Sequence, residues 1–123
     1  MQGAYLESVS AEVARALSSR TEIAAICDIL QTIATDEARL AAHGWDVIDF
    51  CRAHGGELVE HALETAVVRL PTLEASLAPL AASGALEPFG IPGLALTQRC
   101  ESNARAACLA RLRDTPQPLT AIT

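Results

Sequence analysis

Histidine and cysteine side chains, which bind zinc or act in nucleophilic catalysis, gather in one short stretch of this chain. Cys51 and His54 are three residues apart, so on a helix they share one face. A thiolate and an imidazole at this spacing can bind the same zinc ion. His61, from the next predicted helix, would be a third ligand, and Cys27 or a carboxylate would complete a tetrahedron.

The same stretch also has a structural interpretation without any bound metal. Cys51 belongs to the apolar set of Val47, Ile48 and Phe50, where a free cysteine is an ordinary small core residue. Structural zinc sites combine two paired half-sites such as CxxC or CxxH, and only one half-site is present. A metal- or small-ligand-binding domain centred on Cys51, His54 and His61, with zinc as its cofactor, therefore remains the alternative hypothesis.

Evidence for an enzyme is weak. A Cys51–His54 nucleophile pair would need a thiol with a lowered pKa and an oxyanion donor, and no residue pattern indicates either. The chain has no Gly-rich phosphate loop, no GxSxG motif and no HExxH motif. We therefore expect a protein that is not an enzyme and that carries no cofactor.

Charge and length narrow the class of protein further. The 123 residues fit one domain, and the net charge is −6, with nine arginines, no lysine and 15 acidic residues. Because affinity for nucleic acid depends largely on basic side chains that neutralise phosphates, this balance argues against a nucleic-acid binder. It favours instead a partner with a basic surface.

The first residues lack the basic segment and apolar run of a secretory signal, and no apolar run is long enough to cross a bilayer. We therefore expect a cytoplasmic protein that does not bind membranes. In that compartment thiols are normally reduced. The four cysteines are then expected to be free rather than paired: Cys27, Cys51, Cys100 and Cys108.

Apolar residues recur at helical spacing along most of the chain, and no segment predicts a strand. We expect an all-α fold, a compact bundle of five or six helices arranged as antiparallel hairpins. The predicted helices are approximately 4–17, 20–44, 46–54, 57–70, a weaker one at 72–83 in which Pro79 causes a kink or starts a second short turn, and a last one from Leu94 or Thr97 to Arg113. An alternative to the helix 20–44 is a separate short helix capped by Thr35 or Asp36. Gly44, Gly55-Gly56 and Pro71 are the expected helix ends. Residues 1–113 form the predicted single domain, and 114–123 a mobile or partner-docked tail.

The apolar content exceeds what such a thin bundle can hide, which predicts a homo-oligomer, most simply a homodimer, and a protein-binding function. The expected partner-binding face is an apolar groove or dimer surface with an acidic rim that attracts a basic partner. Its apolar part comprises Ile23, Ile26, Leu30, Ile33, Leu63 and Val67, and its rim Glu57, Glu60 and Glu64. The expected class is an adaptor, chaperone, neutralising protein or regulator.

Overall fold

A computed structural model describes residues 1–72 and 78–114, and in these residues all regular structure is helical. The elements are α1 (Gln2–Ser18), α2 (Ala24–Val68), α3 (Pro79–Ala82), a 3-10 turn η1 (Glu87–Phe89) and α4 (Leu94–Arg113). The predicted all-α class is confirmed. The predicted number of five or six helices is not, because the described residues contain four α-helices.

The count differs because α2 continues through Gly44, where the sequence had predicted the end of a helix. Gly44 instead lies where α2 crosses α1: a Cβ added there would stand 3.0 Å from the Cβ of Ala4. The next residue, Trp45, is buried in the core. The glycine therefore permits a close approach of two helices and does not end one.

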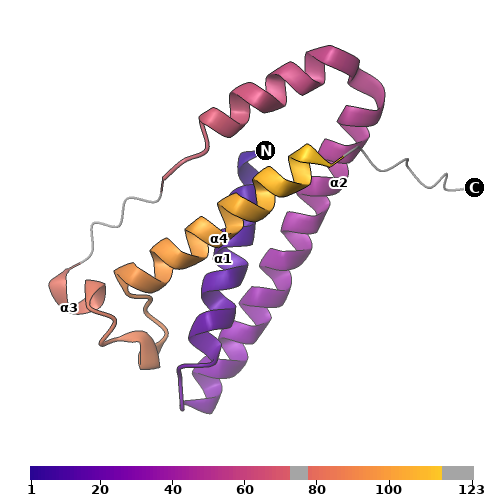
Figure 1. The fold of residues 1–123 in the computed structure, drawn as a ribbon. Coiled ribbons are helices and arrows are strands. Elements are labelled where there is room, and N and C mark those ends of the chain that lie inside the picture. Colours follow the sequence, from indigo (N-terminus) through magenta and orange to yellow (C-terminus); the bar gives the residue numbers. More distant parts are fainter. Residues whose placement is uncertain (73–77, 115–123) are drawn as a thin grey trace, which may run out of the picture.

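The predicted break at Gly55-Gly56 is confirmed. Gly56 has φ 58° and ψ −145°, a conformation that is essentially restricted to glycine, and α2 turns sharply there. The turn divides α2 into a first arm, residues 24–55, and a second arm, residues 57–68. In Figure 1 the first arm rises from the bottom of the molecule and the second arm runs back across the top.

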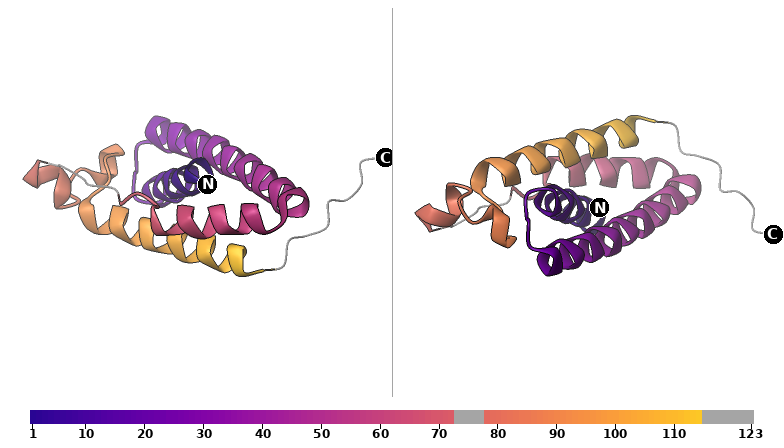
Figure 2. Two further views of the ribbon diagram at one scale, coloured as in Figure 1. Left: turned by 90° about the horizontal axis from the view of Figure 1, so that it is seen from above. Right: turned by 90° about the horizontal axis from the view of Figure 1, so that it is seen from below.

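Helix α1 lies at the centre of the molecule. Figure 2 shows it enclosed between the first arm of α2 on one side and the second arm and α4 on the other. Tyr5 is completely buried, and Val9 nearly so, in a cluster that includes Trp45. A second cluster joins Ala14 and Leu17 of α1 to residues of α2 and α4. The core is thus built around α1.

The chain between the second arm and α4 is held by one buried carboxylate. Glu87 forms an ion pair with Arg20 and accepts a hydrogen bond of 3.2 Å from the backbone N–H of Gly93, which immediately precedes α4. Of the weaker helix predicted at 72–83, the structure shows α3 from Pro79, and residues 73–77 lie outside the described residues. Helix α4 begins at Leu94, the earlier of its two predicted starts, and ends at Arg113 as predicted. Beyond Asp114, the predicted tail lies outside the described residues. None of the described helices is long and apolar enough to span a bilayer.

Candidate functional site

The structure does not bring the candidate zinc ligands together. Among residues 1–72 and 78–114, no group of three or more His, Cys, Asp or Glu side chains is placed so that it could hold a metal ion. Cys51 and His54 follow each other near the end of the first arm, whereas His61 lies on the exposed side of the second arm. The three residues flank the turn at Gly56 but do not converge on one point.

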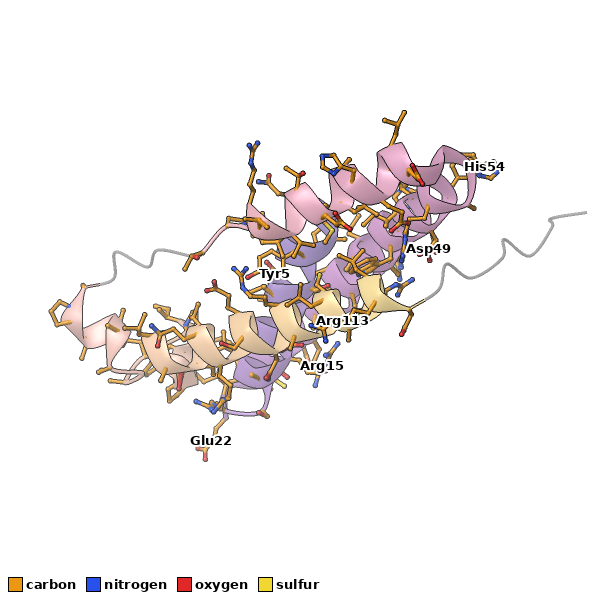
Figure 3. The ribbon with its side chains drawn as sticks, turned by 45° about the horizontal axis from the view of Figure 1, so that its top comes forward. Tyr5, Arg15, Glu22, Asp49, His54 and Arg113 are labelled. Atoms are coloured by element: carbon orange, nitrogen blue, oxygen red, sulfur yellow. The ribbon has the colours of Figure 1, made fainter. Side chains whose placement is uncertain are left out.

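His54 has its own local role at this corner. Its Nδ1 donates a hydrogen bond of 2.9 Å to the carbonyl oxygen of Phe50, and its ring stacks on the Phe50 ring at 4.3 Å between centroids. Figure 3 shows the side chain at the outer edge of the molecule. Cys51 beside it is exposed, so the interpretation of Cys51 as a core residue is wrong. The buried residues of this part of the first arm are instead Ala34, Ala41, Trp45 and Ile48.

Two of the other cysteines lie in the core. Cys100 and Cys108 are buried under α1, and burial raises the pKa of both thiols. Since the thiolate is the reactive form, a raised pKa and a closed environment both suppress reactivity. All four cysteines are free. The half-buried Cys27 lies with its Sγ 3.5 Å from the carbonyl oxygen of Ser18.

The predicted partner-binding residues are divided between opposite ends of α2. Ile23 is the N-cap of α2, and Ile26 and Ile33 lie in the first half of the first arm, which begins at the bottom of Figure 1. Leu63 and Val67 lie on the second arm at the top. Leu30 is only 7% exposed and belongs to the core cluster with Ala14 and Leu17. No single groove therefore contains the whole predicted set.

Four members of the set do come together, at a groove between the second arm and the end of α4. We call it the acidic groove; it has a volume of about 320 Å³. Its lining residues are Glu60, Leu63, Glu64, Val67, Leu112 and Arg113. Leucine and valine side chains from two helices supply the apolar part, while Glu60 and Glu64 stand on one edge. The contribution of α4 was not predictable from the periodicity of the second arm alone.

Arg52 positions the second arm against α4. Its side chain is 7% exposed; its Nε lies 2.8 Å from a Glu60 carboxylate oxygen, and one terminal nitrogen donates to the Leu112 carbonyl at 3.1 Å. One guanidinium thus connects the first arm, the second arm and the last turn of α4. A planar group with several fixed donors is well suited to this contact. Arg52 thus joins two residues that line the acidic groove, Glu60 and Leu112.

The rim of the groove is acidic and partly uncompensated. Glu57 and Glu64 are exposed, and neither forms an ion pair with another described residue. Glu64 lines the groove, whereas Glu57 precedes it on the second arm and lies outside the lining. Glu60 is neutralised in part by Arg52. Arg113 also belongs to the lining and is the basic side chain among its described residues. The groove therefore combines apolar side chains with Glu60 and Glu64 on the second arm, and of these two carboxylates only Glu64 lacks an ion-pair partner among the described residues.

A second surface, which the sequence analysis did not single out as a unit, runs along the first arm. Five large apolar side chains there are between 42% and 60% exposed: Ile29, Ile33, Leu40, Val47 and Phe50. We call this set the outer stripe. The seven-residue spacing of Ile33, Leu40 and Val47 is a signal that could have revealed it. At Ile33 the stripe borders an apolar groove of about 330 Å³ that also contacts Val13 and Leu17.

Comparison with known proteins returns no match: no protein-family model, no curated protein and no solved structure is significantly similar to this chain. The functional argument therefore depends on the two surfaces themselves. One is the acidic groove formed by the second arm and α4, and the other is the outer stripe of the first arm.

Proposed function

We propose that this chain is a non-enzymatic protein-binding module, of the adaptor, chaperone, neutralising or regulatory class, and that it takes a basic, apolar segment of a partner into the acidic groove. The observation that carries this proposal is the convergence of Leu63, Val67 and Leu112 beside Glu60 and Glu64. An amphipathic helix that places apolar anchors in a groove is a recurrent mode of peptide recognition.

The charge distribution supports a basic partner. The chain carries a net charge of −6, and Glu57 and Glu64 have no ion-pair partner among the described residues. Negative charge at the edge of an interface raises the association rate of a positively charged partner and disfavours acidic competitors. The apolar side chains of the groove would supply the affinity, and the carboxylates beside them would supply the selectivity for a basic partner.

The proposal includes self-association and a reducing compartment, most simply the cytoplasm. The four cysteines are free in the structure, which supports an environment that keeps thiols reduced. The exposed outer stripe supports self-association, since large apolar side chains gathered on one helix face often mark a contact surface.

A designed peptide pair tests the proposed function. The first peptide is a helix with leucines at positions i, i+3 and i+7 and arginines elsewhere, and the second replaces each arginine by glutamate. We expect the full chain to bind the first peptide and not the second, with affinity that falls as salt is added. Fluorescence anisotropy of the labelled peptides measures both effects.

Charge reversal on the chain supplies the matched control. Glu57→Lys combined with Glu64→Lys should weaken binding of the arginine peptide at least about tenfold. The same net change made elsewhere, by Glu22→Lys with Asp28→Lys, should leave it nearly unchanged, because both residues are exposed far from the groove. Equal binding of the two peptides, binding of neither, or equal effects of the two double variants would contradict the proposal.

A further inference from the structure

The outer stripe repeats every seven residues over nearly the whole first arm. Ile26, Ile33, Leu40 and Val47 are spaced by seven, and they alternate with a second series three residues further on. That second series consists of Ile29, Asp36, His43 and Phe50. Apolar residues at such a and d positions form the seam of a coiled coil, in which two helices pack along each other. Within one chain the core already occupies the other side of this helix.

The seam is available for a contact. Ile33, Leu40 and Val47 are 42%, 48% and 50% exposed, whereas Ala34, Ala41 and Ile48, each the next residue along, are buried. A helix that needed only one packed face would carry polar residues where the stripe lies. The exposed apolar side chains therefore indicate a second contact partner for the first arm.

Charges beside the seam determine which partner and which orientation fit. Arg39 and Asp46 stand seven residues apart at the positions that flank the seam, and Asp36 and His43 lie within it. Arg39 makes only a loose ion pair with Asp36, at 3.9 Å, and both side chains are more than half exposed. Two parallel, in-register copies would place Asp36 against Asp36 and His43 against His43 within the seam, and would leave Arg39 and Asp46 without an opposite charge across it, which is unfavourable.

An antiparallel pair of first arms removes this conflict. With a two-fold axis close to residues 41 and 42, Arg39 of each copy faces Asp46 of the other, which forms two opposite-charge pairs. In the same register Ile33 of one copy meets Phe50 of the other, and Leu40 meets His43. The surface is thus complementary to itself in its flanking charges and where Ile33 meets Phe50, while Asp36 lies opposite Val47.

We infer that the outer stripe is the contact of a homodimer, in which the first arms of two copies pack antiparallel as a short coiled coil. Asp36 and His43 interrupt the apolar series, and polar seam residues of this kind lower the stability of a coiled coil. The inference rests on the self-association included in the proposed function and deepens it, and it is independent of the acidic groove, which lies on the second arm outside this contact. The dimer would present two acidic grooves.

Sedimentation equilibrium tests the dimer directly. We expect a monomer–dimer equilibrium for the full chain in reductant, and Leu40→Asp should weaken it at least about tenfold. Leu58→Asp is the matched control: Leu58 is 85% exposed on the second arm, and its substitution should leave the equilibrium unchanged. Circular dichroism would verify that both variants fold. The inference would be overturned if the chain stayed monomeric up to about several hundred micromolar, since a dimer that forms only above this concentration is weak for a specific complex. It would also be overturned if Leu40→Asp left the dimer unchanged.

Charge exchange tests the orientation. Arg39→Asp and Asp46→Arg should each weaken the dimer, and the double variant should restore it, because the opposite-charge pairs then reform with their roles exchanged. A parallel dimer would gain nothing from the double variant. Peptide binding in the acidic groove should survive Leu40→Asp, so the two proposals fail separately.

Discussion

The two arms of α2 share one helix but are held in different ways. The first arm buries Leu30, Ala34, Ala41, Trp45 and Ile48 against the core, whereas no residue of the second arm is fully buried. The second arm depends on the half-buried Leu63, on Leu70 beyond its end, and on the Arg52 contact. Packing of apolar side chains therefore fixes the first arm, and a few anchors fix the second. The second arm has the greater freedom to adapt to a ligand.

Substitution of Trp45 should reduce the stability of the fold more than any other change proposed here, because the first arm packs against the core through this residue. Trp45→Ala leaves a cavity among Tyr5, Val9 and Ile48 and removes the contact of Arg111 with the indole, and we expect a loss of roughly 3–5 kcal/mol in the free energy of unfolding. Phe50→Ala, at 54% exposure on the same arm, should cost far less in a dilute sample. Urea denaturation measures both, and similar losses would contradict the assignment of inner and outer sides.

Removal of Arg52 should loosen the second arm selectively. Arg52→Ala deletes the contacts with Glu60 and the Leu112 carbonyl, and hydrogen bonds of charged groups contribute about 1.5–3 kcal/mol. We expect faster amide hydrogen exchange in residues 57–70 with little change in residues 30–48. Arg52→Lys keeps the charge but not the planar group and should be intermediate. Uniform acceleration of exchange throughout the chain would mean that the two arms unfold as one unit.

The turn between the arms should depend on the backbone freedom of Gly56. Gly56→Ala meets no atom within 4 Å, so its cost comes from the positive φ alone, and strain of this kind costs about 1–3 kcal/mol. Gly3→Ala, which is also unobstructed but lies in α1, should instead stabilise the protein by about 0.5–1 kcal/mol. Thermal unfolding of the two variants compares them, and a neutral Gly56→Ala would contradict the turn geometry.

The smallest effect concerns α1, on which the first arm packs. Burial raises the pKa of the Glu12 carboxyl, and the nearby Arg15 only partly opposes this. Because the folded protein then holds the Glu12 proton more tightly than the unfolded chain, stability falls as the pH rises above the usual glutamate range. Glu12→Gln should therefore gain a little stability relative to the original chain between pH 4 and pH 7. The exposed Glu22→Gln serves as the control, and an identical pH profile for all three proteins would contradict the burial of Glu12.

Much of the helix pattern was predictable because it depends on local signals. Apolar periodicity, the Gly55-Gly56 pair and the glycine before Leu94 placed α1, the turn of α2 and α4 close to their observed bounds. The prediction at Gly44 was wrong because a glycine can either end a helix or allow another helix to approach closely. Only the position of Ala4 shows that Gly44 allows a close approach. That contact is between residues far apart in the sequence.

The candidate surfaces were predictable only in part. Periodicity marked both Ile29 and Leu30 as apolar but could not decide that Leu30 faces α1 and Ile29 faces outward. It likewise identified Leu63 and Val67 without showing that the end of α4 would complete their groove. The zinc hypothesis required Cys51, His54 and His61 to converge, and the direction of the turn at Gly56 keeps them apart.

Chemical-shift mapping of the full chain with the arginine-rich peptide tests the central claim most directly, namely that the acidic groove is a protein-binding site. The account predicts that amide signals of residues 60–67 and 112–113 move on titration, and that signals of the outer stripe do not. Shifts spread over all acidic surface residues, or none at all, would contradict it.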